Sequence, residues 1–195
     1  MGDIVLAGAT SGTITLQPTA VAGSSTLTLP AANATVLTSV SAQSAFPPNI
    51  AGNGPAFRAY LSSNQTVTTN VNTKVTLNAE NFDTANCFDS TTNYRFTPNV
   101  AGYYQINALI GAGASTALNY NYVQIWKNGS QESISLYGPY SGTSSFGQLA
   151  TLIYMNGTTD YIELYAQLSG TGTLNVIGGT GAVSTYMSGF LARAA

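Results

Sequence analysis

The sequence predicts an all-β fold, and two patterns support that prediction. From residue 56 onward, short runs of alternating apolar and polar residues follow one another, separated by clusters of Gly, Pro, Asn and Ser. Alternation of this kind, with turn residues roughly every 8–12 positions, is typical of a β-sandwich or barrel. No stretch shows the sustained apolar repeat of about 3.6 residues that an amphipathic helix requires.

The first predicted strands lie in residues 1–45, which contain no aromatic residue. Gly12–Pro18 alternates hydroxyl-bearing and aliphatic residues, Ser25–Pro30 repeats the pattern, and Ala34–Thr38 is a weaker third copy. Two or three strands of this size are marginal alone in water. We therefore expect them to pair between chains or with a partner, the alternative being a flexible arm with strand propensity.

A linker is predicted at residues 46–56, which hold three prolines and two glycines. The expected organisation is a β-repeat attachment segment at 1–45, this linker, and a head domain at 57–195. The strands predicted from residue 56 onward are 56–61, 66–69, 73–79, 93–97, 102–111, 119–127, 132–137, 146–156, 160–168, 173–177 and 183–193.

Alternation also predicts which side chains form the core of the head. In 102–111, Tyr104, Ile106, Ala108 and Ile110 share one face; in 160–168, Ile162, Leu164 and Ala166 do the same. Three Gly-rich stretches, 111–114, 170–172 and 178–181, are predicted to be loops of the sandwich. None precedes a helix or a phosphate-binding lysine, so they are not phosphate loops.

The composition excludes several classes of function. The 195 residues include five Lys+Arg, seven Asp+Glu, one Cys and no His, and 6% are charged, whereas about a quarter is usual. Ser-His-Asp and Cys-His nucleophiles, His/Cys zinc or haem sites and an intramolecular disulfide are therefore impossible. We expect no enzyme, no cofactor, no nucleic-acid partner and no membrane partner.

The N-terminal sequence lacks targeting signals. No basic residue precedes Arg58, whereas a signal peptide requires a basic region followed by an apolar stretch. No run approaches the roughly 18 apolar residues of a membrane span. A protein assembled in a host cytoplasm and released in a virion fits these features.

Six motifs in the head occur in the order found in one superfamily. The first three are an aromatic first strand (Ala56–Tyr60), a strand with an aspartate-bearing loop (Val75–Asp89) and a Phe-x-Pro and Gly-x-Tyr strand entry (Phe96–Tyr104). The last three are a Lys-Asn-Gly hairpin (Val123–Gly129), an Asp-containing turn (Asn156–Ile162) and a closing Ser-Gly-Phe-Leu strand (Ser188–Leu191). Together they resemble the globular head of the complement first-component and tumour necrosis factor superfamily. The resemblance implies a ten-stranded jelly roll that assembles as a tight homotrimer.

The N-terminal repeats resemble a second group of proteins. The segments Gly12–Gly23 and Thr26–Ala32 are similar to a segment common in virion proteins of tailed bacteriophages. The collagen stalk typical of complement proteins is absent, which argues against a secreted animal protein. Together the two resemblances imply a trimeric protein of the phage surface.

Candidate contact residues follow from this interpretation. Twelve tyrosines could provide a carbohydrate- or receptor-binding surface, with Tyr137 and Tyr140 in a predicted loop and Trp126, Tyr120 and Tyr122 on one strand face. The alternative is that tyrosine lines the sandwich or the trimer interface because it favours strands. The residues expected to attach the protein to a capsid are aliphatic ones of the N-terminal segment 1–45: Ile4, Leu6, Ile14, Leu16, Leu27 and Leu29.

Four carboxylates, Asp83, Asp89, Asp160 and Glu163, could be considered as a calcium site. Their spacing fits no calcium-binding loop, and solvated turn carboxylates are the simpler interpretation. A glycosidase acid–base pair is a further alternative with no support from spacing. Cys87 is expected to be a small buried or loop residue.

The function expected from these features is a homotrimeric capsid decoration, or cement, protein of a tailed phage. Its N-terminal strands would bind the major capsid protein or another virion protein. The alternative is a receptor-binding knob of a tail or head fibre that contacts a host surface polysaccharide. A secreted complement-like ligand is disfavoured because no signal peptide is present.

Overall fold

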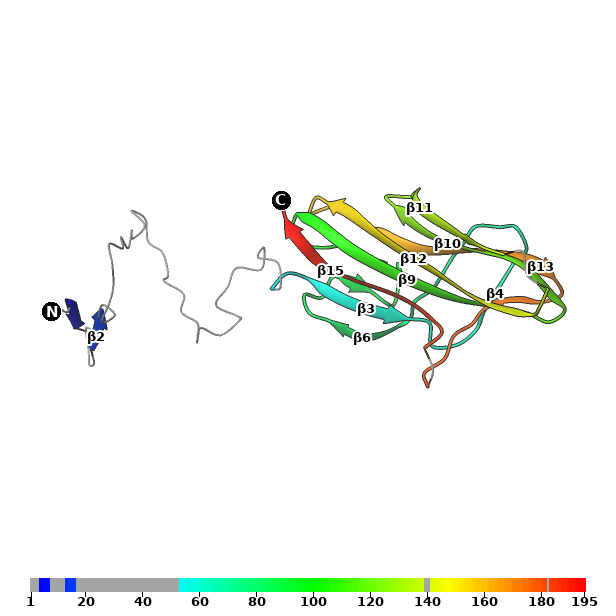
Figure 1. Ribbon diagram of the computed structural model, residues 1–195, viewed down its shortest axis with the longest axis horizontal. Helices are drawn as coiled ribbons and strands as arrows, with labels where there is room; N and C mark the ends of the chain where they lie inside the picture. Colours follow the sequence, from blue (N-terminus) through cyan, green and yellow to red (C-terminus); the bar gives the residue numbers. More distant parts are fainter. Residues whose placement is uncertain (1–3, 8–12, 17–52, 139–140, 182) are drawn as a thin grey trace, which may run out of the picture. The chain divides into compact units, whose positions relative to one another are not determined.

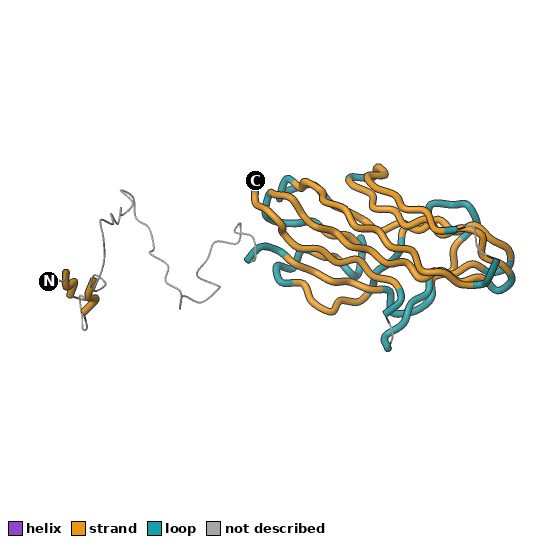
Figure 2. The backbone as a smooth tube through the Cα atoms, viewed as in Figure 1, coloured by secondary structure: helices purple, strands orange, loops and turns teal. Residues whose placement is uncertain are grey.

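The computed structural model describes residues 4–7, 13–16, 53–138, 141–181 and 183–195. The chain divides into two compact units, Met1–Ser39 and Val40–Ala195. The described residues are strands, turns and loops without a helix (Figure 2). No helix that could cross a membrane is therefore found among them.

The described part of the first unit is a two-stranded antiparallel sheet of β1 (Ile4–Ala7) and β2 (Thr13–Leu16). Strand β2 lies within the predicted strand 12–18, and β1 was not predicted. The two strands pair within one chain, with Ile4 opposite Leu16 and Leu6 opposite Ile14. The predicted copies at 25–30 and 34–38, with Leu27 and Leu29, lie outside the described residues.

The second unit, called the head here, is a sandwich of two antiparallel sheets. The seven-stranded sheet contains β3 (Ala56–Tyr60), β4 (Gln65–Val67), β6 (Ala79–Asp83), β9 (Gly102–Ala114), β12 (Ser144–Met155), β14 (Leu174–Val176) and β15 (Thr185–Ala194). Its order is β4-β14-β9-β15-β3-β6, and β12 pairs with β9. Figure 1 shows β12, β9, β15 and β3 side by side.

The six-stranded sheet covers the other side of the core. It contains β5 (Thr73–Lys74), β7 (Phe88–Asp89), β8 (Arg95–Phe96), β10 (Ala117–Lys127), β11 (Ser130–Tyr137) and β13 (Ile162–Thr171). Its order is β11-β10-β13-β8-β7, and β5 also pairs with β13. The all-β, two-sheet sandwich predicted from the alternation pattern is confirmed.

The core lies between the sheets and is formed by the predicted inward positions. The predicted inward residues of β9 and β13 are almost completely buried. Phe57 stacks on Phe96 with ring centroids 4.2 Å apart, and the Phe96 ring meets Tyr104 edge-on at 5.5 Å. The Tyr104 hydroxyl donates to the Val100 carbonyl at 2.8 Å, which satisfies the polar atom of a buried ring.

Several strand predictions were wrong in detail. Strands β6 and β7 were not predicted, because Ala79–Asp83 shows no period-2 alternation and Phe88–Asp89 is only two residues long. Of the predicted strand 73–79, Thr73–Lys74 pairs with β13 and Ala79 begins β6, whereas residues 75–78 lie outside the strands. The described part of the head therefore holds thirteen strands, β3 to β15, rather than ten; β5, β7 and β8 are two-residue ladders that account for the difference.

The Gly-rich stretch 111–114 is part of strand β9 and not a loop. A Cβ on Gly111 would lie 2.9 Å from the Ser184 carbonyl oxygen, so the close approach of a neighbouring backbone requires glycine there. Gly170 and Thr171 likewise end β13. Of the three predicted loops, the described part of 178–181 is a loop.

The head has two ends, which we call proximal and distal. At the proximal end the chain enters at Asn53–Ala56, and Leu191 N–H donates to the Pro55 carbonyl at 3.0 Å beside the C-terminus. Strand β9 runs from this end to the distal end, where it turns into β10. In Figure 1 the C-terminus marks the proximal end, and the label β4 lies near the distal end.

Candidate assembly surface

The outer face of the seven-stranded sheet exposes large apolar side chains. Tyr103, Phe146, Leu152, Tyr154 and Phe190, which we call the apolar face, are 43–56% exposed. They occupy outward positions of β9, β12 and β15, because residues that alternate with them point into the core. A contiguous exposed apolar patch of this kind marks an interaction surface in a folded protein.

The strand register places these side chains next to one another. Tyr154 is opposite Tyr103, and their rings meet edge-on with centroids 5.5 Å apart. In the next outward row, Leu152 and Phe190 flank Gln105 from either side. These four side chains therefore form one patch across three strands, whereas Phe146, opposite Gly111, lies further along β12.

Two of the five basic residues of the chain lie on this sheet face. Arg58 of β3 lies over the Tyr186 ring at 4.4 Å from its centroid, so its cation covers an aromatic ring. Arg193 lies at the proximal edge, beside an open pocket of 470 Å³. That pocket is lined by Tyr103, Leu152, Ala192, Arg193, Ala194 and Ala195.

Both sheets end in a long edge strand on the same side of the sandwich. Among the described strands, β12 pairs with β9 alone and β11 pairs with β10 alone. Tyr137 donates its hydroxyl to the Gln148 carbonyl on the outer edge of β12 at 2.6 Å, and Lys127 Nζ donates to the Tyr154 carbonyl at 2.7 Å. Edge strands of this length promote pairing with other chains unless covered.

Strand β11 adds two apolar residues to this edge. Ile134 and Leu136 are 47% and 50% exposed on the outward side of β11. Tyr137, predicted as a recognition residue in a loop, is the last residue of β11 and half-buried, with its hydroxyl bound to Gln148. Tyr140 lies outside the described residues.

The outer face of the six-stranded sheet carries aromatic residues with polar partners. Trp126 stacks on Tyr165 with ring centroids 4.3 Å apart, and its indole N–H donates to Gln124 Oε1 at 2.8 Å. Gln124 in turn donates to Asn72 Oδ1 at 2.8 Å. Burial, with the nearby Glu163 carboxylate second, raises the pKa of Tyr165.

The same face contains a charged pair. Lys74 Nζ lies 2.5 Å from Glu163 Oε1, and their side chains are 29% and 7% exposed. Glu163 was interpreted as a solvated turn carboxylate, but it is buried near the start of β13, opposite Trp126 of β10 and Arg95 of β8. The attraction to the Lys74 cation offsets the desolvation cost of burying the Glu163 carboxylate.

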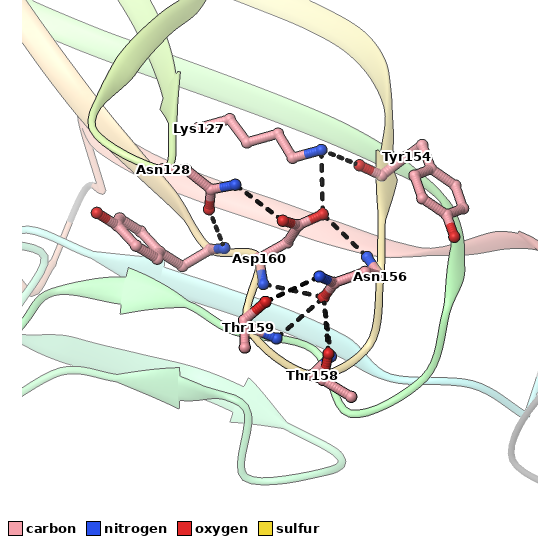
Figure 3. A network of polar contacts seen from close by, with 8 residues as sticks. Lys127, Asn128, Tyr154, Asn156, Thr158, Thr159 and Asp160 are labelled. Atoms are coloured by element: carbon pink, nitrogen blue, oxygen red, sulfur yellow. Dashed lines mark hydrogen bonds and ion pairs between the residues drawn. The ribbon is translucent and has the colours of Figure 1, made fainter.

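Asp160 joins the two sheets at the proximal end (Figure 3). Its carboxylate accepts from Asn128 Nδ2 at 2.8 Å, from Asn156 N–H at 3.0 Å and from Lys127 Nζ at 3.1 Å. These hydrogen bonds, that of Asn128 first, lower the pKa of Asp160. Lys127 and Asn128 follow from β10, whereas Asn156 follows β12, so the network links one sheet to the other.

The remaining candidate carboxylates have structural partners of their own. Asp83 accepts from the backbone of Phe88 at 2.7 Å. Asp89 accepts from the backbone of Thr91, Thr92 and Asn93, and these hydrogen bonds lower its pKa. Among the described residues no group of three or more His, Cys, Asp or Glu could hold a metal ion. Cys87 is buried, and that burial raises its pKa.

The register of the N-terminal sheet bears on the predicted attachment residues. In an antiparallel pair, directly opposite residues lie on the same face, and alternate residues of each strand do as well. The pairs Ile4–Leu16 and Leu6–Ile14 therefore share one face, with Val5, Ala7, Thr13 and Thr15 at the positions of the other. Four of the six predicted attachment residues are thus brought together.

Sequence reasoning missed the apolar face. The signal was present in Leu152-Ile153-Tyr154-Met155, where apolar residues occupy both outward and inward positions. A strand that is apolar on both faces is covered on both faces. The sequence could have indicated a second covered side of β12, although not the residues of β9 and β15 beside it.

Comparison with solved structures identifies the fold. The globular domain of zebrafish complement 1qA protein superimposes with a TM-score of 0.52 at 13% identity, over 72% of this chain and 99% of that one. Murine APRIL gives 0.53 at 7% identity (70% and 98%), and Eiger TNF from S. frugiperda gives 0.54 at 8% (72% and 93%). No family model and no curated protein matches the sequence. The head therefore has the jelly-roll fold of the complement first-component and tumour necrosis factor heads.

Proposed function

We propose that this chain is a structural protein of a virion surface, a homotrimeric decoration protein of a tailed phage. The head forms the trimer, and the N-terminal strands attach it to the shell. The observation that carries this proposal is the apolar face of the head. It is accompanied by a separate N-terminal pair of strands, whose register places Ile4 opposite Leu16 and Leu6 opposite Ile14.

Trimerisation is supported by the head surface and by its fold. Proteins with this fold usually trimerise. The apolar face and the exposed Ile134 and Leu136 provide a sheet surface and an edge that another copy can cover. In a closed ring, each copy presents its edge to one neighbour and its sheet face to the other.

Attachment by the N-terminal segment is supported by the size of the β1–β2 sheet. Each strand has four residues, and a single two-stranded sheet is marginally stable at best in water. A docked partner would bury the face formed by Ile4, Leu6, Ile14 and Leu16. Three such segments in one trimer would bind a symmetric shell with an affinity raised by multivalency.

A receptor-binding knob of a fibre is the second candidate, and it would use the same trimeric head. Copy number per virion separates the two candidates. Quantitative mass spectrometry of purified particles should find on the order of hundreds of copies for a decoration protein that follows shell symmetry. A handful of copies, located at a tail or fibre in a virion reconstruction, would favour the knob.

Removal of residues 1–45 tests the assigned roles of the two units. We expect the truncated protein to remain a folded trimer in size-exclusion chromatography with light scattering, and to be absent from sedimented particles. If the truncated protein is monomeric, the N-terminal strands and not the head hold the assembly together. If it still sediments with particles, the attachment segment has been assigned wrongly.

A further inference from the structure

Charge is distributed unevenly along the length of the head. The head sequence contains four runs without any Asp, Glu, Lys or Arg: 59–73, 96–126, 133–159 and 164–192. Each run passes through the distal end, where β9 turns into β10, β11 leads to β12 and β13 turns into β14. The distal end therefore carries no formal charge in its described residues, whereas the proximal end holds pairs such as Lys127–Asp160.

Hydrogen bonds join the distal loops to one another. Ser115 accepts from Thr173 N–H through Oγ at 2.9 Å, and its own N–H donates to the Thr173 carbonyl at 2.9 Å. Leu118 N–H donates to the Gly142 carbonyl at 2.9 Å. Ala114 N–H bonds the Thr143 carbonyl, and Thr69 Oγ1 bonds Gly170, so four loops form one connected unit.

We call this unit the distal loop cluster. It comprises Thr68–Asn70, Ser115–Asn119, Ser141–Thr143 and Gly170–Thr173. Leu118 is buried in the core, and Ala117 and Gly170 are partly buried. The other residues are exposed and are all Ser, Thr, Asn or Gly. Gly172 has a φ of +80°, and a Cβ there would lie 2.3 Å from Ser115 Oγ, so the turn is closely packed against its neighbour.

Two aromatic rings border the cluster. Tyr120 and Tyr122 lie at outward positions of β10, immediately after Asn119, with ring centroids 6.4 Å apart. Each side chain is partly exposed. Rigid tyrosines combined with small hydroxyl and amide side chains are the composition of antibody recognition loops, where tyrosine provides contact area and Ser, Gly and Asn provide hydrogen bonds.

We propose that the distal loop cluster and the adjoining Tyr120 and Tyr122 bind a neutral saccharide. A sugar ring has an apolar face that packs on an aromatic ring and hydroxyl groups that bond hydroxyls and amides. The uncharged surface matches an uncharged ligand, because it offers no counter-ion to an acidic saccharide or a charged peptide. The connected loops are pre-organised, which lowers the entropic cost of binding. The inference does not depend on how the chain is attached to a particle.

The test uses the full chain on an array of neutral and acidic oligosaccharides, followed by titration of the strongest neutral ligand. We expect binding to neutral members, with a Kd that is nearly unchanged between low and high salt, since charge screening acts only on charged groups. Binding only to acidic members, a steep salt dependence, or no binding to any neutral member would each overturn the proposal.

Matched variants locate the surface. The triple variant Thr116→Ala/Asn119→Ala/Thr143→Ala removes three exposed polar side chains of the cluster and should weaken binding about tenfold or more. The control Thr92→Ala/Ser130→Ala/Gln131→Ala removes exposed polar side chains near the proximal end and should bind as the unaltered chain does. Equal melting temperatures establish that both variants fold. Unchanged binding by the distal variant would overturn the assignment of the surface.

Discussion

The outer faces of the two sheets differ in whether their large side chains have partners within the same chain. On the six-stranded sheet, Trp126 is stacked on Tyr165 and hydrogen-bonded to Gln124, and the charged Lys74 and Glu163 neutralise each other. On the seven-stranded sheet, Leu152 is 56% exposed and Phe190 is 50% exposed. No group in the described part of the chain covers either side chain. On the first face the exposed large apolar side chains are Ile134 and Leu136, at the edge strand β11. On the second face they lie on β9, β12 and β15, which gain stability when another surface covers them.

The difference teaches where the molecule is expected to associate. Apolar area gains about 25 cal/mol for each Å² removed from water, so three adjoining strands of exposed apolar side chains provide a strong driving force. Away from the β11 edge, the face with polar partners gains little from being covered, because its hydrogen bonds are already made. Assembly through the seven-stranded sheet therefore follows from the contrast between the faces.

The largest expected effect comes from placing a charge on the apolar face. We expect Leu152→Arg to abolish trimerisation, because a trimer would have to bury three unpaired cations. Light scattering should then give the mass of one chain, 20.1 kDa. Ser169→Arg, on the outer face of the six-stranded sheet, is the matched control and should remain a trimer. Loss of the trimer in the control alone would reverse the comparison between the faces.

A smaller effect is expected from breaking the ion pair on the six-stranded sheet. Lys74→Met leaves the Glu163 carboxylate, 7% exposed, without its cation, and should cost about 2–3 kcal/mol of unfolding free energy. Urea unfolding measures this cost. The double variant Lys74→Met/Glu163→Gln removes both charges and should recover most of it. If the double variant is no more stable than Lys74→Met, the unpaired charge on Glu163 is not the cause of the lost stability.

The smallest effect concerns the Asp160 network that joins the sheets. Because hydrogen bonds lower the pKa of Asp160 in the folded state, its contribution is fully present above the pKa of an unfolded aspartate, about 4. It is lost as the pH falls through the lowered value. We expect Asp160→Asn to cost about 1 kcal/mol at neutral pH, with the difference from the unaltered chain shrinking in acid.

Unfolding curves recorded from neutral to acidic pH measure that difference. Glu132→Gln serves as the control, because Glu132 is exposed on β11 and makes no ion pair in the described residues. Its stability should follow that of the unaltered chain at every pH. A difference for Asp160→Asn that grows in acid would contradict the assigned role of the carboxylate.

Much of the fold could be predicted because alternation is a local signal. The inward residues of β9 and β13 were identified correctly, since each strand contacts the core along its whole length. Strand β6 escaped prediction because it shows no alternation and pairs with β3, which is distant in sequence. Strand β7 escaped because it is only two residues long. The burial of Glu163 could not be predicted either, because its partner Lys74 is 89 residues away.

The sequence by itself determined that this is an all-β protein without histidine, without a disulfide and with little charge, because composition and period-2 alternation need no knowledge of neighbours. Only the tertiary structure showed that the apolar side chains of β9, β12 and β15 form one surface and that the charge-free runs meet at one end of the head. Both arrangements arise from strands that are distant in sequence and adjacent in the sheets. Their register is set by packing of the whole core, which no local pattern contains.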